Sequence, residues 1–557
     1  MSLDRGVCRR FATALADASR EPPPFEDAPC ATTVLVATGG AGALASLFAA
    51  VVLPAPIRSA VAGLGFAVAV LGGGLAWFAP EQIVAFRRRS AVGAAPEVMA
   101  YAVVQSRLTP SLERAGAFAA AQSDGLLGRD LARVGADGAP GREGWTAFAE
   151  RWAEHDETLP RAVELLAAGI ESSPPARGDL FDRALETALD GSRDRVATFA
   201  ADVRGPATGI YAFGVLLPLA MVGLLPVAAG AGAGIAPAAI AVLYDGVIPL
   251  GLLLASAWLA TKRPAVSRPP TNGSAVASPR SPAVTAVVGA GAGTAAAVVA
   301  RLVLPPWSTW VVVPGVALGA AAVHWFAPVR ERRRRVATIE SGVPDAVSLV
   351  GHRLASGDPL EAAVDGVGDR LAGETGSVFA DAAAVLRRLR VTVPEAFGST
   401  VGPLADVTSP RTETAVDLLV AGARNGPEGG ETLVTVAGYL RELDRVERAA
   451  RRDLARTTDT LRQTALVFGP AIAGVTVALA TGMGSLGETG GAVPVAALGV
   501  VVGVYVLGLA VVLPALAVVL ERGFALPRIG FRVGVALLTA SAVYPTTVLV
   551  ARQVVQV

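Results

Sequence analysis

Lysine, cysteine and histidine are almost missing from this sequence, and each shortage removes a class of function. The chain has a single lysine, Lys262, outside any G-x-x-x-x-G-K-[ST] motif, so no nucleotide-binding loop of that kind is present. The two cysteines, Cys8 and Cys30, make neither a disulfide framework nor a zinc site. The three histidines lie far apart and lack the spacing of metal ligands: His155, His324 and His352.

A nucleophile motif of the G-x-S-x-G kind is also missing. We therefore expect a protein that is not an enzyme and that holds no cofactor and no metal. The formal net charge of +1 points to no particular partner, and we expect no nucleic acid among the partners.

Charge is scarce and unevenly spread. Asp, Glu, Lys and Arg make up 17% of the 557 residues, and they collect in two stretches, roughly 80–206 and 328–463. A charge at the centre of a membrane-spanning helix costs about 2.5–3.5 kcal/mol. The nearly uncharged blocks between the two stretches therefore predict membrane segments. Short alternating strands, which a spanning barrel needs, are not found, so these segments should be helices.

Nine apolar runs reach the length of about 20 residues that a bilayer core requires. The sequence thus predicts an all-α integral membrane protein with about nine transmembrane helices and two cytoplasmic helical-bundle domains. The predicted spans are Thr32–Leu53, Ile57–Phe78, Ala207–Ala229, Ile235–Ala260, Ala283–Val303, Trp307–Phe326, Thr464–Gly484, Val493–Leu520 and Ile529–Val550. The predicted divisions are 1–31 (cytoplasmic), 32–79 (two spans), 80–206 (first domain), 207–260 (two spans), 261–282 (flexible linker), 283–327 (two spans), 328–463 (second domain) and 464–557 (three spans).

Arginine placement predicts the orientation, because short cytoplasmic segments are enriched in arginine and lysine. With the N-terminus in the cytoplasm, both charged stretches face inside and the C-terminus ends outside. Arg58 and Arg301, near outside turns, are the exceptions. The segments that then fall inside are Arg87–Arg89, Lys262–Arg280, Arg332–Arg335 and the pair Arg522 and Arg528. A multi-pass protein of the cell membrane is expected.

The two halves of the chain resemble each other. Trp77-Phe78-Ala79-Pro80 recurs 248 residues later as Trp325-Phe326-Ala327-Pro328, and the same offset carries Leu112-Glu113 to Leu360-Glu361. Each half predicts two spans, a charged domain and two spans, and the second half adds a ninth helix. Both halves begin inside, so the sequence predicts a parallel duplication.

Both charged domains should be helical. In the second, Asp358-Pro359 and Ser409-Pro410 predict helix starts, with a capping side chain followed by proline. Gly426-Pro427 and Gly429-Gly430 are expected to break the chain before a long helix that starts near Glu431. Its apolar spacing and the pairs Asp444/Arg448 and Glu447/Arg451 indicate one helix that continues into the seventh span.

In the first domain, apolar side chains at helical spacing indicate core packing or, as the alternative, a groove for a partner: Trp145, Phe148 and Trp152. The arginine runs Arg87–Arg89 and Arg332–Arg335 have two interpretations as well. They are topology anchors that contact anionic membrane lipid, or they dock a partner.

Asp245 lies within the apolar run Ile235–Ala260. An intramembrane carboxylate suggests a functional site, for example one coupled to protonation. The alternative is a helix break at which Asp245 caps a second half-helix, and Gly246 and Pro249 favour that alternative.

Several short motifs carry a resemblance to a known family. They are Gly422-Ala423-Arg424-Asn425-Gly426, Gly429-Gly430-Glu431-Thr432-Leu433, Phe468-Gly469-Pro470, Tyr211 to Pro218, and Gly223-Leu224-Leu225-Pro226. With the duplicated layout, they resemble the F-type inner-membrane platform proteins of type II secretion, type IV pilus and archaellum assembly systems, in the archaeal two-domain form. The first domain lacks a clear Gly-Gly-Glu element.

The resemblance implies a non-enzymatic platform that couples a separate cytoplasmic ATPase to the assembly of pilin-like subunits, and it suggests a homodimer. An archaellum, an adhesive pilus and a secretion role all remain open. The candidate motor-docking residues are Arg332, Arg333, Arg334, Arg335, Glu431, Arg441, Glu442 and Asp444. Two other classes compete, a secondary transporter built from two parallel repeats and a membrane sensor or scaffold without a motor.

Overall fold

The computed structural model describes most of the chain from residue 91 onward, and every regular element in that part is helical. The first two predicted spans, Arg87–Arg89 and most of the linker lie outside the described residues. The described ranges are 91–123, 125–136, 141–230, 237–263, 281–398, 402–404, 410–484, 495–523 and 525–555.

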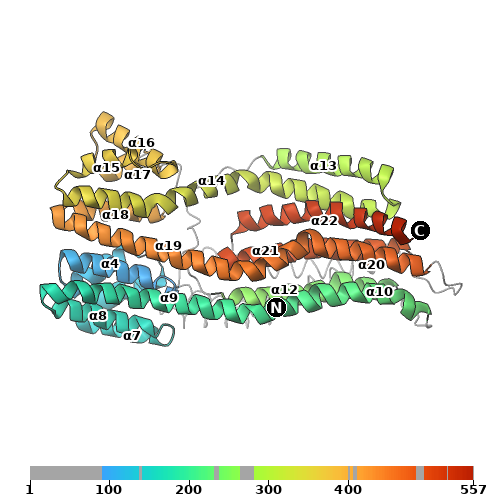
Figure 1. The fold of residues 1–557 in the computed structure, drawn as a ribbon, viewed down its shortest axis with the longest axis horizontal. Helices are drawn as coiled ribbons and strands as arrows, with labels where there is room; N and C mark the ends of the chain where they lie inside the picture. The colour runs from blue at the N-terminus through green and yellow to red at the C-terminus, as the bar shows by residue number, and fades with distance from the viewer. Residues whose placement is uncertain are drawn as a thin grey trace, which may run out of the picture.

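Seven helices of the described part are long and apolar enough to cross a membrane. Each overlaps one of the seven spans that the sequence predicts after residue 206. The chain is therefore an all-α, multi-pass membrane protein, and its membrane helices form one end of an elongated molecule (Figure 1).

Two polar bundles form the other end. The first bundle consists of α4 (Ala95–Leu108), α5 (Leu112–Gln122), α6 (Leu126–Ala136), α7 (Arg142–Ala153), α8 (Thr158–Glu171) and the beginning of α9 (Pro174–Tyr211). The second bundle consists of the end of α14 (Thr309–Ala355), α15 (Leu360–Gly368), α16 (Glu374–Leu389), α17 (Val393–Gly398), α18 (Pro410–Ala423) and the beginning of α19 (Gly426–Gln463).

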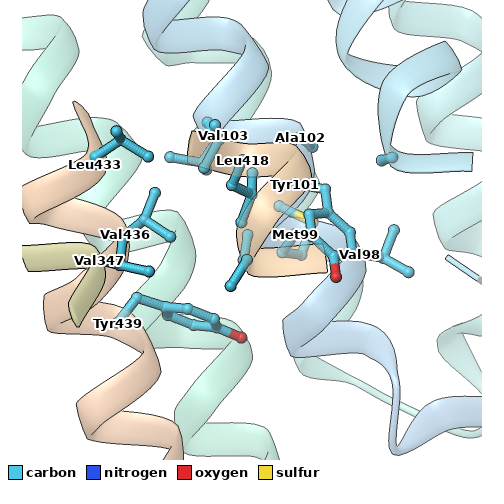
Figure 2. Packing of buried hydrophobic residues seen from close by; sticks show 14 of the residues in the cluster. Val98, Met99, Tyr101, Ala102, Val103, Val347, Leu418, Leu433, Val436 and Tyr439 are labelled. Atoms are coloured by element: carbon cyan, nitrogen blue, oxygen red, sulfur yellow. The ribbon is translucent and has the colours of Figure 1, made fainter. Parts of the chain in front are cut away.

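The two bundles share one hydrophobic core. Figure 2 shows side chains of α4 from the first bundle, such as Met99 and Val103, beside Leu418 of α18 and Val436 of α19. In Figure 1, α19 lies between α14 of its own bundle and α4 and α9 of the other. The bundles therefore pack as one body, which the sequence did not predict.

The aromatic side chains of α7 lie inside this core, as the first interpretation of the sequence expected. Phe148 has no exposed surface, and Trp145 is 2% exposed. The indole nitrogens of Trp145 and Trp152 donate to the Leu112 carbonyl and to Asp130, each at 3.0 Å. Buried indole N–H groups need such acceptors, so these residues serve packing and not a partner groove.

Three long helices connect the bundles with the membrane. They run through Pro174–Leu225 (52 residues), Pro306–Ala355 (50 residues) and Gly426–Ala480 (55 residues). The predicted continuous helix into the seventh span is thus confirmed. The remaining membrane elements are α10 (Leu217–Gly230), α11 (Pro237–Ala241), α12 (Ile248–Thr261), α13 (Pro282–Val303), the 3₁₀ turn η3 (Pro306–Ser308), α20 (Gly469–Gly484), α21 (Val495–Arg522) and α22 (Leu526–Val555).

Two predicted boundaries in the second bundle are wrong. Helix α19 begins at Gly426, not near Glu431, and Gly429 and Gly430 lie inside it. A Cβ on Gly429 would lie 1.9 Å from the Gly422 carbonyl oxygen, and one on Gly430 would lie 2.3 Å from the backbone nitrogen of Ala355. These glycines do not break the helix. Because they lack a Cβ, they let α18 and α14 approach α19 closely.

Asp358 does not cap α15. That helix begins at Leu360, its N-cap position is Pro359, and no side chain caps it. Ser409, the other predicted cap, lies outside the described residues.

Wide π turns interrupt three of the membrane helices: η1 (Ala212–Leu216), η2 (Val242–Val247) and η4 (Thr464–Phe468). Each ends two residues before a proline, at Pro218, Pro249 and Pro470. A proline removes one helical N–H, and its ring clashes with the carbonyl four residues earlier. The extra residue of a π turn relieves that clash and keeps the chain helical.

Candidate coupling site between the bundles and the membrane helices

The end of α19 is bonded to the end of α21 through Glu521. The Glu521 carboxylate accepts hydrogen bonds from Arg462 at 2.6 Å and from the Thr458 hydroxyl at 2.5 Å. Arg462 also bonds Asp459 at 2.7 Å, one turn away. Charge-assisted bonds of this kind are about twice as strong as neutral ones. Helix α19 is thus fixed to a neighbouring membrane helix at the point where it leaves the second bundle.

Arg263, directly after α12, bonds the same end of α21. Its Nε donates to the Leu520 carbonyl at 3.0 Å, and its Nη2 donates to the Glu521 carbonyl at 3.5 Å. The last carbonyls of a helix lack partners within the helix and carry partial negative charge, which a guanidinium satisfies. Arg263 therefore links a span of the first half to a span of the second.

Arg263 stays cationic at neutral pH although it is buried. Burial lowers the pKa of its guanidinium, and the charge of Arg451 lowers it further. The nearby Glu447 offsets part of this effect, and the pKa is about 10. Glu447 is itself buried and accepts a hydrogen bond from Arg451 at 2.9 Å.

One of the two pairs predicted along α19 is confirmed as an ion pair, Glu447 with Arg451. In the other, Arg448 donates to the backbone carbonyl of Asp444 at 3.1 Å. Sequence reasoning missed the coupling residues Arg263, Arg462 and Glu521. The sequence held one signal for Glu521, because an acidic residue at the end of the long apolar run of α21 indicates an interaction at the membrane boundary.

The candidate motor-docking residues are divided between α14 and α19. Three of them bind within the protein: Arg335 to Glu374 at 2.9 Å, Arg441 to Asp345 at 3.1 Å, and Glu442 to both Arg193 and Arg445. Arg332, Arg334 and Glu431 are exposed, while Arg333 and Asp444 are half-buried.

These residues do not form a single patch. Helices α14 and α19 run in opposite directions, and the pair Asp345–Arg441 sets their register. Arg333 and Glu431 therefore lie on opposite sides of that pair. At 1.5 Å per residue they are about 30 Å apart along the helix axes. A partner would have to cover a long strip to contact both groups.

Two tyrosines stabilise the π turn η1 within the membrane region. Pro218 lacks the N–H that would bond the Gly214 carbonyl, and the Tyr505 hydroxyl of α21 donates to that carbonyl instead. The Tyr244 hydroxyl of η2 donates to the Pro218 carbonyl at 2.6 Å. The two rings pack edge to face, with centroids 5.6 Å apart. Helix α21 thus closes the gap that the proline opens in the first half.

Asp245 lies next to Tyr244, inside η2. The predicted helix break is wrong, because η2 continues directly into α12 and the N-cap position of α12 is Val247. The Oδ1 atom of Asp245 is buried and has no hydrogen-bond partner among the described residues. A buried carboxylate oxygen without a partner is costly at this place, which keeps Asp245 a candidate functional residue.

No group of three His, Cys, Asp or Glu side chains in the described ranges could hold a metal ion. No family model matches the chain, and neither does any curated protein or solved structure. The family resemblance therefore remains a prediction from the short motifs.

Proposed function

We propose that this chain is the membrane platform of a type IV pilus-like, archaellum or type II secretion machine. In this proposal a separate ATPase acts on the two bundles, and the platform passes the motion to pilin-like subunits in the membrane. The observation that carries the proposal is the unbroken helix Gly426–Ala480, which joins the second bundle to the membrane.

A continuous helix transmits displacement because its backbone hydrogen bonds resist bending and stretching. The bonds of Arg462 and Thr458 to Glu521 connect this helix to α21, so a shift of the bundle would also move α21. Arg263 joins α12 to the same point. Movement of one bundle would in this way reach spans of both halves.

Matching helix lengths support the duplication that the proposal requires. Helices α8 and α18 both have 14 residues, and α9 and α19 both have 38. Each long helix continues through a π turn of five residues, η1 or η4. The starts of these pairs are 252 residues apart, from 158 to 410, 174 to 426 and 212 to 464.

The first part of each bundle follows the shorter offset of the sequence repeat. Helix α6 begins at residue 126 and α16 at 374, which is 248 residues later. The second half therefore has four additional residues between the start of α16 and the start of α18. These lengths favour two bundles with a common plan, each attached to its own set of spans.

The finer topology belongs to the same proposal. Both bundles and the N-terminus would face the cytoplasm, and residues 32–79 would add two spans to make nine. The exposed Arg332, Arg334 and Glu431 are the candidate docking residues that remain accessible to an ATPase. The absence of a lysine-containing nucleotide loop agrees with an energy source on another chain.

The proposal is tested by interrupting the long helix. A short Gly-Ser insertion after Gln463 should abolish surface filaments or secretion while membrane insertion and the amount of protein stay unchanged. The matched control carries the same insertion in the predicted linker after Ser274, away from the coupling residue Arg263, and should keep its activity. Full activity of the first variant would overturn rigid transmission through α19. Failure to recover an ATPase with the purified wild-type protein would argue against the platform itself.

A secondary transporter is the second candidate, and the unpaired Oδ1 atom of Asp245 is the observation that favours it. Transporters place polar groups near the bilayer midplane, and Asp245 lies within an otherwise apolar span. Substrate flux by the purified protein in liposomes, lost in Asp245→Asn, would establish the transporter and exclude the platform as its sole function.

A further inference from the structure

Five arginines gather where the membrane helices meet the bundles. They lie on α14, at the end of α21 and at the beginning of α22: Arg330, Arg333, Arg522, Arg528 and Arg532. Arg528 is close enough to interact with Arg333 and Arg522, and Arg532 with Arg330 and Arg522. Within the described part of the chain, no carboxylate oxygen lies within 4.0 Å of any of their side-chain nitrogens. We call these five residues the arginine cluster.

Arg528 faces mostly positive charge. Its neighbours are Arg522, Arg333 and Arg451, with Glu340 as the one carboxylate among the charges that act on it. The other acids nearby already have partners, because Glu521 binds Arg462 and Glu447 binds Arg451. The cluster therefore holds an excess of positive charge that the described side chains do not neutralise.

The backbone adds to this excess. Helix α22 begins at Leu526, and its first turn contains no acidic residue. The amino end of a helix carries about half a positive charge, which disfavours a cation and favours an anion there. Arg528 nonetheless lies in this first turn. Two sources of positive charge meet at this point, so an anion bound there would stabilise the folded protein.

The place of the cluster indicates which anion binds. The apolar run of α22 starts at Ile529, directly after Arg528. The Arg330 guanidinium lies 4.3 Å above the ring centre of Phe531, and the Phe326 ring packs against Gly530. The cluster thus lies at the depth where apolar helix surface begins, which is the depth of lipid phosphates.

We propose that the arginine cluster binds the phosphate of an anionic phospholipid, such as phosphatidylglycerol, with Arg333 and Arg528 as its central contacts. Arginine suits this ligand because its guanidinium forms paired hydrogen bonds with phosphate oxygens. The bound lipid would connect α14, α21 and α22. This site does not depend on the proposed platform function.

The test uses the full-length protein in nanodiscs of phosphatidylcholine, with or without phosphatidylglycerol. Phosphatidylglycerol should raise the melting temperature of the wild type, and the variant Arg333→Gln/Arg528→Gln should lose more than half of that rise. Its affinity for a fluorescent phosphatidylglycerol should fall about thirtyfold, since each arginine contributes about 1 kcal/mol. An unchanged rise and an unchanged affinity in this variant would overturn the proposal.

Two further variants separate charge from folding. Arg333→Lys/Arg528→Lys keeps both charges and should retain most of the rise. Arg370→Gln/Arg388→Gln removes two exposed arginines from the second bundle and should behave as the wild type. If this control loses the rise equally, general charge and not the cluster attracts the lipid, and the proposal fails.

A last arm distinguishes lipid from soluble phosphate. Glycerol phosphate added to phosphatidylcholine nanodiscs should leave the melting temperature unchanged. A rise equal to that from phosphatidylglycerol would assign the cluster to a soluble anion and overturn the lipid site. So would loss of a bound acidic protein from the double glutamine variant, with lipid binding unchanged.

Discussion

Arg193 of α9 and Glu442 of α19 form an ion pair between the two bundles. Each also has a partner on its own helix, Asp190 at 2.6 Å and Arg445 at 2.9 Å. The four side chains therefore form one chain of charges across the boundary between the bundles. The buried residues of the shared bundle core end beside this chain, at Leu189 and Tyr439. The apolar cluster of the membrane region lies beyond it, with Phe199 and Leu454.

Removing this pair should weaken the contact between the bundles only modestly. Partly exposed pairs contribute about 0.2–1 kcal/mol, because water screens them. We expect a coupling energy in that range from a double-mutant cycle of Arg193→Ala and Glu442→Ala, measured by chemical unfolding in detergent. A coupling energy near zero would show that the shared core alone joins the bundles.

The same pair should depend on acid. Burial tends to raise the pKa of Glu442, but hydrogen bonds from Arg445 and Arg193 outweigh this and lower it below its ordinary 4.5. A lowered pKa means that the contribution to stability is complete above 4.5 and is lost as the pH falls through the folded-state value. The coupling energy should therefore be present at neutral pH and decline as the pH falls below 4.5. A coupling energy that increases in acid would contradict this account.

Substitution of Asp156 should reduce stability far more than loss of the Arg193–Glu442 pair. Asp156 is buried, binds Arg195 at 2.9 Å and accepts two hydrogen bonds from Thr158, where α8 begins. Asp156→Ala leaves Arg195 without its partner and should destabilise the protein by about 3 kcal/mol. The control Asp179→Ala removes an exposed carboxylate from α9 and should change stability little. Equal losses from both variants would show that the buried pair has no special weight.

The Tyr505 hydroxyl can be removed without changing the packing of its ring. Tyr505→Phe leaves the Gly214 carbonyl unpaired next to Pro218, which should cost about 1 kcal/mol in detergent or bilayer. The matched control is Tyr211→Phe, because no bond to the Tyr211 hydroxyl is found among the described residues. A loss from the control alone would refute the proposed role of Tyr505.

Asp245→Asn should stabilise the folded protein, because an amide of the same size costs less in apolar surroundings than an unpaired carboxylate. Thermal unfolding in nanodiscs measures whether the variant is more or less stable than the wild type. Lost stability would instead reveal a cationic partner for Asp245. Unchanged assembly and transport in the same variant would dismiss a functional role for the carboxylate.

The sequence predicted the seven spans of the described part well, because length and apolarity alone define them. It also located the long helix of α19 and the buried aromatic side chains of α7, since helical periodicity marks one apolar face. The meaning of Gly429-Gly430 was not predictable, because glycine suits both a chain break and a close helix contact. Only the positions of the Gly422 carbonyl and the Ala355 backbone decide between them.

The helix break at Asp245 was wrongly predicted for the same reason, because the local sequence suits two structures. Gly246 and Pro249 are compatible with a break or with a π turn, and the choice depends on a neighbour that can satisfy freed backbone groups. For η1 that neighbour is Tyr505, which is 291 residues from Gly214 in the chain. Likewise, periodicity shows that Val436 is buried but not that α4 of the other bundle helps to cover it.

The shared core also decides stoichiometry. Because Met99 and Val436 belong to one hydrophobic cluster on one polypeptide, every copy of the first bundle is made together with one copy of the second. Neither can be produced in excess or exchanged for a different partner. Expressed as separate chains, each half would expose this apolar face and would have to find the other before aggregating.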